Sequence, residues 1–280
     1  MITPGQADSI RNHAYVPEQL IGYGEAISGG EPFLLDDFLA YVSPGTLIFI
    51  GYPLEGSFQE EKMDRILESA IERFRPAQVA LVAPRITRRQ GTRHPSDSYF
   101  RLDLKNLKIP SKVRNMIQRA SRDLEVQVER EITSEHQELI SQFLQSHPVD
   151  PAMRALFEKI PRYVSQVPSA QLFNARSHDG ALCGFDVADF GGAHYAFYMF
   201  NFRSSRRPVP GVSDLLLNAI VQKALRQEKS YLNLGLGIGP GVSFFKKKWG
   251  GQIFLNYEAV CFDPRPPSLW STILKGAFPS

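Results

Sequence analysis

The residues best suited to chemistry lie in the stretch YLNLGLGIGPGVSFFKKKWGG, residues 231–251. It joins an apolar strand pattern, glycines at every second position from 235 to 241, and an aromatic, lysine-rich segment. The glycines do not match the Gly-x-Gly-x-x-Gly spacing of a dinucleotide loop. The Walker A pattern, Gly-x-x-x-x-Gly-Lys followed by Ser or Thr, is absent as well. The stretch therefore predicts neither kind of nucleotide loop.

A second candidate is the basic loop that precedes the apolar helix predicted at residues 213–227. Arg206 and Arg207 come shortly before Gly211, Val212 and Ser213, where that helix begins. Free backbone N–H groups at a helix N-terminus, with arginines beside them, suit a phosphate group. The pattern predicts an anion-binding loop, and a solvated basic loop remains the alternative.

Polar residues inside apolar strands are the remaining candidates. Asn233 lies in a predicted strand, where a buried amide needs a partner, and contact with substrate or an oxyanion would supply one. Tyr198 is a candidate general acid, although its aromatic neighbours are equally typical of a core. Asp186 is a candidate base. Lys246 is either a phosphate contact or a structural lysine with a buried stem.

Other catalytic patterns are missing. No pair of the 6 histidines has metal-ligand spacing with acidic or cysteine partners, so no metal is predicted. No Gly-x-Ser-x-Gly nucleophile pattern occurs. The 2 cysteines, Cys183 and Cys261, lie in apolar strand-like stretches and are expected to be buried free thiols.

Composition and charge narrow the class of protein. The chain of 280 residues is 43% hydrophobic, has no apolar run of the roughly 18 residues that a membrane span needs, and lacks a signal-peptide pattern. We therefore expect a cytoplasmic protein. Residues 1–105 carry 11 Lys and Arg against 14 Asp and Glu, whereas residues 106–280 carry 21 against 15. The basic excess of the later part suits an anionic ligand, such as a phosphorylated cofactor or RNA.

Hydrophobic periodicity predicts an α/β order of elements. Residues 1–30 read as an irregular segment, followed by strand 46–53, helix 60–75, and strands 77–84 and 99–104. A helix at 109–123 carries a basic face. The later part predicts a strand, two helices, a three-strand antiparallel meander, and then helix, strand, helix and strand (124–131, 133–147, 150–164, 170–177, 181–190, 193–202, 213–227, 231–237, 242–250 and 253–262). A Pro-rich tail follows at 264–280, with a docking turn near Leu269 and Trp270.

This order resembles the GCN5-related N-acetyltransferase (GNAT) fold. Three stretches also resemble Fem-type aminoacyltransferases and the C-terminal domain of phosphatidylglycerol lysyltransferases, which carry two tandem copies of that fold. They are SKVRNMIQRASRDLEVQVE, PGVSDLLLNAIVQKALRQEKSYLNLG and GVSFFKKKWGG. The resemblance covers residues 110–262.

The resemblance implies a fold and a function. The fold would be a mixed, mostly antiparallel sheet flanked by helices, with a reduced first copy at 1–109 and an acyltransferase domain at 110–263. The fourth and fifth strands of that domain, 193–202 and 231–237, would splay apart around the acyl donor. An amine would attack the donor carbonyl directly while a backbone N–H polarises it. The implied site residues are Asn233, Tyr198 and Asp186 for catalysis, and Phe200, Asn201, Arg206, Arg207, Gly211, Val212, Ser213 and Lys246 for the cofactor.

The donor and acceptor stay open among three interpretations. The first is transfer from acyl-CoA or another thioester to a small-molecule amine or peptide. The second is a Fem-type transferase that uses aminoacyl-tRNA, for which a basic surface joining residues 112–122 to Lys246–Lys248 would be expected. The third is a binding module without catalysis, because Pro208 and Ser213 depart from the usual pyrophosphate loop.

Overall fold

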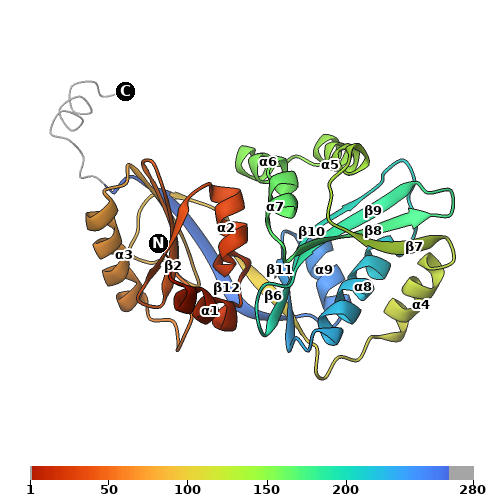
Figure 1. Cartoon of the computed structure of the whole chain (residues 1–280), viewed down its shortest axis with the longest axis horizontal. Helices are drawn as coiled ribbons and strands as arrows, with labels where there is room; N and C mark the ends of the chain where they lie inside the picture. Colours follow the sequence, from red (N-terminus) through yellow and green to blue (C-terminus); the bar gives the residue numbers. More distant parts are fainter. Residues whose placement is uncertain (1, 265–280) are drawn as a thin grey trace.

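The computed structural model describes residues 2–264, which form two α/β halves joined along one sheet (Figure 1). The first half begins with helices α1 (Pro4–His13) and α2 (Ile21–Ser28), which a 3-10 turn at Pro17–Gln19 separates. Its other elements are β1 (Glu31–Leu35), β2 (Phe38–Ser43), β3 (Thr46–Ile50), α3 (Glu60–Phe74) and β4 (Gln78–Ala83). From residue 265 onward the predicted tail lies outside the described residues.

The second half follows two connecting strands, β5 (Thr92–Arg93) and β6 (Asp97–Asp103). Its order matches the sequence-based prediction from residue 124 onward, except that the helix predicted at 150–164 is divided at Lys159 into two helices. The elements are α4 (Ser111–Ala120), β7 (Leu124–Glu129), α5 (Ser134–Ser146), α6 (Pro151–Glu158), α7 (Ile160–Gln166), β8 (Ala170–Ser177), β9 (Leu182–Asp189), β10 (Tyr195–Arg203), α8 (Val212–Arg226), β11 (Tyr231–Leu236), α9 (Pro240–Lys248) and β12 (Gln252–Phe262).

The two halves repeat one arrangement of strands. In the first, β1, β2 and β3 are antiparallel, and helix α3 then leads to β4, which runs parallel to β3. In the second, β8, β9 and β10 are antiparallel, and helix α8 leads to β11, which runs parallel to β10. The first copy is the shorter one, as the sequence predicted.

Strand β12 links the two copies. Its first residues pair with β6, and its last residues, Glu258–Phe262, pair with β4. The strand order of the sheet is therefore β1-β2-β3-β4-β12-β6-β11-β10-β9-β8-β7. Since β6 precedes residue 109 and pairs with β11, strand pairing crosses the domain boundary that the sequence predicts at 109/110. That boundary stays a prediction.

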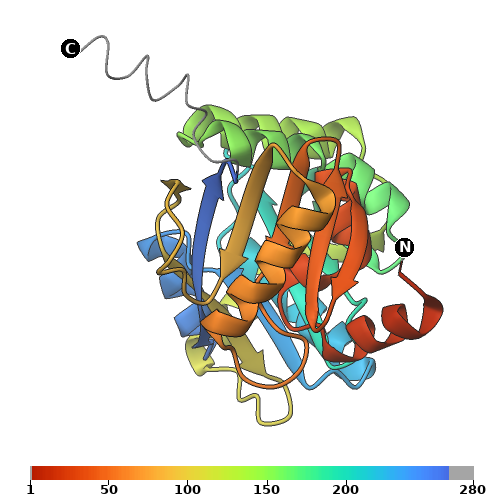
Figure 2. The same cartoon turned by 90° about the vertical axis from the view of Figure 1, so that its left-hand side faces the viewer.

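Helices cover both faces of each half. Apolar residues of α3, including Met63 and Leu67, pack on one face of the N-terminal strands, and Figure 2 shows α3 lying across that face. In the second half, α4 and α8 pack on one face of the sheet, and α5, α6 and α7 pack on the other. None of the helices in residues 2–264 combines the length and apolarity that crossing a membrane requires.

The prediction that residues 1–30 are irregular was wrong. Thr3 begins α1 with a reciprocal capping pair, in which its hydroxyl accepts from Gln6 N at 3.3 Å and its N–H donates to Gln6 Oε1 at 2.9 Å. Helix α2 contains Gly24, whose missing side chain leaves room for Tyr41: a Cβ there would lie 1.8 Å from the tyrosine ring. That helix depends on a contact with β2 that the local sequence does not reveal.

Candidate active site

Strands β10 and β11 diverge in the middle of the second copy. They pair in parallel only at their beginnings, where Tyr195, Ala196 and Phe197 lie opposite Tyr231, Leu232 and Asn233. Beyond Phe197, β10 stays paired with β9 alone. The backbone groups that β10 directs toward β11 after Phe197 consequently have no strand partner. The predicted splay between these two strands is present.

A β-bulge in β10 gathers four of the predicted residues on one sheet face. The register against β9 shifts between Tyr198 and Phe200, so Tyr198 and Asn201 both end on the face that α8 covers. Asn201 Nδ2 donates to Asp186 Oδ1, and Ser213 Oγ at the start of α8 donates to Asn201 Oδ1 at 3.4 Å. The Tyr198 hydroxyl faces the same carboxyl group.

Burial controls the protonation of this polar cluster. Asp186 is fully buried, which raises the pKa of its carboxyl well above the usual range, and hydrogen bonds from Asn201 only partly oppose that rise. Its Oδ2 has no hydrogen-bond partner among residues 2–264. Burial also raises the pKa of Tyr198. Burial therefore favours the neutral form of both groups, and Asp186 suits a hydrogen-bonding role better than that of a base.

Lys246 is the buried cation at the splay. It is 3% exposed, its Nζ donates to the carbonyl of Leu236, and it lies 5.9 Å from the Phe100 ring centroid. Burial lowers the pKa of Lys246 to about 7, with Asp97 partly opposing the shift. The amine is thus poised between its charged and neutral forms at physiological pH.

Gly235 lies at the same point. Its φ is +74°, and a Cβ placed there would lie 3.6 Å from the Tyr198 carbonyl oxygen and 3.7 Å from Lys246 Nζ. The splay therefore brings together a backbone carbonyl of β10, a glycine of β11 and an amine of α9. Asp97 fixes the loop that follows, since its carboxylate accepts from Gly237 N at 3.1 Å and Ile238 N at 2.8 Å.

The side chains of two predicted site residues make contacts outside the polar cluster. Both ends of the Asn233 side-chain amide form hydrogen bonds with the backbone. Its Nδ2 donates to the Tyr15 carbonyl at 2.7 Å, and its Oδ1 accepts from Gly235 N at 2.7 Å. It fixes the N-terminal segment against β11 and shapes the turn of the chain at Gly235. The Phe200 side chain packs in the apolar cluster beneath α5–α7, on the opposite face from Asn201. A donor would reach Phe200 only through its backbone.

The loop before α8 is held by contacts within the chain. Gly211 has a φ of +88°, and a Cβ there would lie 2.5 Å from the Met116 carbonyl oxygen, so the glycine is needed for close packing against α4. Val212 is buried in the same core. Asp214, in the first turn of α8, accepts from Trp249 Nε1 at 2.9 Å and Lys248 Nζ at 2.6 Å.

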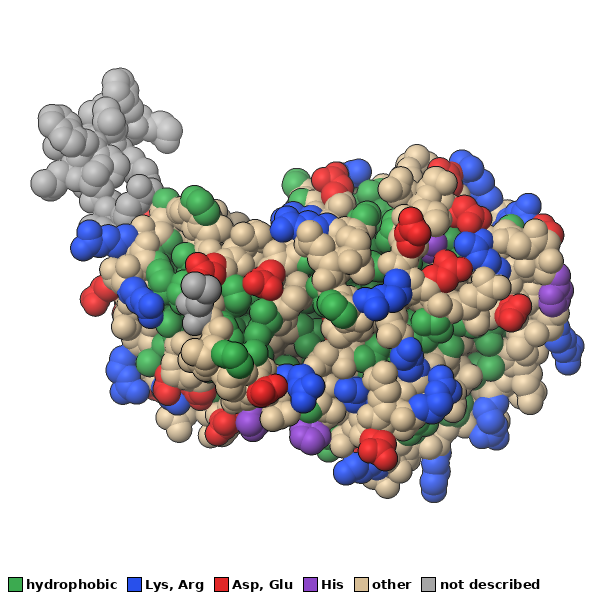
Figure 3. Space-filling view, in the orientation of Figure 1, with side chains coloured by type: hydrophobic (Ala, Val, Ile, Leu, Met, Phe, Trp, Pro, Cys, Tyr) green, Lys and Arg blue, Asp and Glu red, His purple; other side chains and the backbone are tan. Residues whose placement is uncertain are grey.

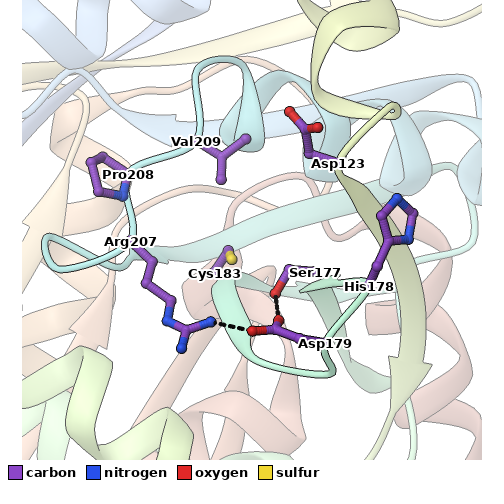
Figure 4. A pocket seen from close by; sticks show the side chains of 8 residues that line it. All are labelled: Asp123, Ser177, His178, Asp179, Cys183, Arg207, Pro208 and Val209. Atoms are coloured by element: carbon purple, nitrogen blue, oxygen red, sulfur yellow. Dashed lines mark hydrogen bonds and ion pairs between the residues drawn. The ribbon is translucent and has the colours of Figure 1, made fainter.

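The two arginines of this loop have acidic partners. Arg206 pairs with Glu138 at 2.9 Å, and Arg207 pairs with Asp179 at 2.8 Å. Bonds from Ser177 and Arg207 hold the pKa of Asp179 well below its usual range. Figure 4 shows the Arg207–Asp179 pair beside an open hollow of about 440 Å³. Its lining residues are Asp123, Ser177, His178, Asp179, Cys183, Arg207, Pro208 and Val209.

Free cations are concentrated on α4 and the loop before it. Lys105, Lys108, Lys112, Arg114, Arg119 and Arg122 are all exposed, no acidic residue interrupts them, and none forms an ion pair within the described part of the chain. We call these six residues the α4 strip. In Figure 3, Lys and Arg side chains gather along the lower right edge, over α4 of Figure 1. The surface does not continue to Lys246, which is buried, or to Lys248, which is paired with Asp214.

Sequence reasoning missed Gly235, Asp97 and Arg101. Gly235 was noted only as part of a glycine pattern, although a glycine inside an apolar strand signals a bulge or a close approach. Arg101 occupies a polar position in the alternating strand YFRLDL, so the local sequence gives no sign of the rings that surround it. Asp97 offers no local signal, because the amides it binds lie about 140 positions along the chain.

Comparison with known proteins defines the fold. The sequence matches no described protein family and no curated protein. L-PGS from Bacillus licheniformis is similar at TM-score 0.57 and 13% identity, covering 98% of this chain and 96% of that one. FemX is similar at TM-score 0.58 and 10% identity, covering 99% and 98%. A tandem GNAT protein from the clavulanic acid biosynthesis pathway is similar at TM-score 0.53 and 11% identity, covering 82% and 79%.

These similarities establish a GNAT fold in tandem arrangement, in agreement with the resemblance seen in the sequence. At such low sequence identity, the similarities show the fold but not the activity. Some similar structures have no known function.

Proposed function

We propose that this protein transfers an acyl group from an activated ester or thioester to an amine, by direct attack in the splay between β10 and β11. The observation that carries the proposal is the meeting of Gly235 with the Tyr198 carbonyl and Lys246 Nζ at the point where β10 and β11 diverge. An acyl carbonyl held there would be polarised by backbone N–H groups of β10 that lack a strand partner. Positioning supplies much of the rate enhancement in such a reaction.

Lys246 is the proposed proton acceptor. The attacking amine forms a bond to the acyl carbon, the bond to the carrier breaks, and the amine loses a proton. A lysine with a pKa of about 7 is neutral in a large fraction of molecules at pH 7 to 8, so it can take that proton. Asp186 and Tyr198, whose neutral forms burial favours, would hold the wall of the splay through hydrogen bonds.

The α4 strip supports aminoacylated RNA as the carrier, although the basic surface that was expected to join it to Lys246–Lys248 does not reach Lys246 or Lys248. The loop before α8 offers little to a pyrophosphate, because Arg206 and Arg207 are paired and Asp214 brings a negative charge to the helix start. The α4 strip, in contrast, presents six cations that form no ion pair among residues 2–264. A CoA thioester remains the second carrier, since the ion pairs of both arginines are exposed and therefore weak.

The test compares carriers with one acceptor-independent assay. The purified protein is incubated with acetyl-CoA, longer acyl-CoAs or bulk aminoacyl-tRNA, and hydroxylamine serves as a general amine that captures the acyl group as a hydroxamate. Lys246→Met should lower the rate by about 10²-fold or more, as for loss of a general base. Lys247→Met, one position along the same helix and exposed, is the matched control and should behave as wild type.

The outcomes separate the interpretations. Transfer from aminoacyl-tRNA that falls with added salt supports the RNA carrier, and transfer from acyl-CoA alone supports the thioester. If no donor is consumed faster than in the absence of protein, the transferase proposal fails and a binding module remains.

A further inference from the structure

Arg101 extends from the middle of β6, on the sheet face turned away from α8. Its neighbour Phe100 packs into the core beneath α8, and alternation along the strand places Arg101 on the other face. The guanidinium lies 4.5 Å from the Tyr231 ring centroid and 4.9 Å from that of Phe254. Its Nη1 donates to the Tyr195 hydroxyl at 2.8 Å. Three rings from three strands thus hold this cation in one orientation.

Arg101 forms no ion pair with a side chain of residues 2–264, although the exposed Asp103 carboxylate attracts its charge. The arginine is half-buried. Asp103, two residues further along β6, is occupied by its own loop: it accepts from Lys105 N at 3.0 Å and from Asn106 Nδ2 at 2.9 Å. A partly desolvated cation without an ion-pair partner is costly unless a ligand supplies the anion.

The geometry leaves one side of the guanidinium available. The Tyr231 and Phe254 rings lie beside the guanidinium, and the Tyr195 hydroxyl uses one of its five N–H donors. The remaining in-plane N–H groups form the fork that binds a carboxylate or phosphate through two parallel hydrogen bonds. Tyr195, Tyr231 and Phe254 are each half-buried as well, so the group reaches solvent.

The position of Arg101 fits an acceptor that reaches into the splay. Arg101 pairs with Asn233 on β11, and Gly235 lies two residues further along that strand. Two residues of strand span about 7 Å. An anionic group bound at Arg101 would therefore lie within the length of a short aliphatic chain from the point where the amine attacks.

We propose that Arg101, with Tyr195, Tyr231 and Phe254, is the anion-recognition site for the amine acceptor. The inference rests on the proposed function and adds to it the acceptor class: an amine that carries a carboxylate or phosphate group a few bonds away. Tyr195 orients the guanidinium through its hydrogen bond, and the Tyr231 and Phe254 rings hold it by cation–π contact.

Binding, measured without any donor, tests this inference separately from catalysis. Isothermal titration compares 6-aminohexanoate with 6-aminohexanamide, and O-phosphoethanolamine with ethanolamine. The wild-type protein should bind the member of at least one pair that carries the carboxylate or phosphate on the order of tenfold more tightly than the partner that lacks it. The pair that shows the difference identifies the anion as carboxylate or phosphate.

Variants assign the preference to Arg101. Arg101→Gln should abolish it, Arg101→Lys should keep part of it, and Tyr195→Phe should weaken it. Arg73→Gln is the matched control, because Arg73 also lies beside two rings, Phe33 and Phe74, but is exposed on α3. Thermal unfolding of each variant reports any structural loss.

Equal binding by the wild-type protein of the partners with and without the anionic group, or an anion preference that survives in a folded Arg101→Gln protein, would overturn the inference. Either result leaves the proposed transfer reaction standing, since that reaction is tested through Lys246. Loss of transfer in Lys246→Met with no anion preference would keep the function and remove only this site.

Discussion

Replacing Lys246 with methionine is expected to change how the stability of the protein depends on pH. Lys246 has a pKa of about 7 in the fold against 10.5 for a free lysine. Between these values the unfolded chain holds a proton that the folded chain has released, so stability must rise with pH across that window. The difference of 3.5 pKa units corresponds to about 5 kcal/mol over the whole window.

Only part of that window is convenient to measure. From pH 7 to pH 9 the same relation gives the wild-type protein a gain of about 2 kcal/mol in its free energy of unfolding from Lys246. Methionine keeps the apolar stem and carries no proton, so Lys246→Met should lack this gain.

Urea unfolding of both proteins at pH 7, 8 and 9 provides the comparison. Other groups titrate in this range too, but they are common to both proteins and cancel in the difference. If wild type and Lys246→Met show the same pH dependence, the amine is not held neutral by burial, and the assignment of Lys246 as proton acceptor is refuted.

Three further changes test other parts of the account. Gly211→Ala should lower the free energy of unfolding by about 2–4 kcal/mol, because of strain at positive φ and the clash with the Met116 carbonyl. Gly180→Ala has a φ of +85° but open space around it, so it should lower the free energy of unfolding by only about 1 kcal/mol. Equal losses in urea unfolding would contradict the packing of Gly211 against α4. Asp186→Asn should change the free energy of unfolding by under about 1 kcal/mol at pH 4. The variant should compare better with wild type at pH 7, because the raised pKa of Asp186 makes the wild-type protein lose stability as pH rises above the unfolded pKa. A larger loss at pH 7 than at pH 4 would contradict the raised pKa. Lys112, Arg114 and Arg119 can be changed together to glutamate, and tRNA binding measured by filter binding at several salt concentrations. The slope of log K against log salt concentration should become less steep by roughly 0.7–0.9 for each phosphate that the variant no longer binds. An unchanged slope would place the RNA elsewhere.

Much of the second copy could be predicted from local sequence. Periodicity and turn residues located the elements from residue 124 onward, because each buries one face with regular spacing. The same signals placed Asp186, Tyr198, Asn201 and Ser213 on neighbouring elements. Their meeting on one face needed the bulge in β10, which the sequence did not reveal.

What the sequence could not predict depends on distant contacts. Asn233 looked like a cleft residue, yet its partner is the carbonyl of Tyr15, 218 positions away. Gly211 looked like a phosphate contact, yet the backbone it approaches is that of α4. Strand β12 was predicted as a strand, but its pairing with both β6 and β4 arises only once both copies are folded.

The pH dependence of acyl transfer tests the central claim most directly. With an acceptor amine that is already neutral across the range, kcat/KM of the wild-type protein should rise with pH through about 7, the pKa of the Lys246 amine. That limb should vanish in Lys246→Met and persist in Lys247→Met. A rise through about 7 that remains in Lys246→Met would contradict the assignment and place the proton acceptor on another residue.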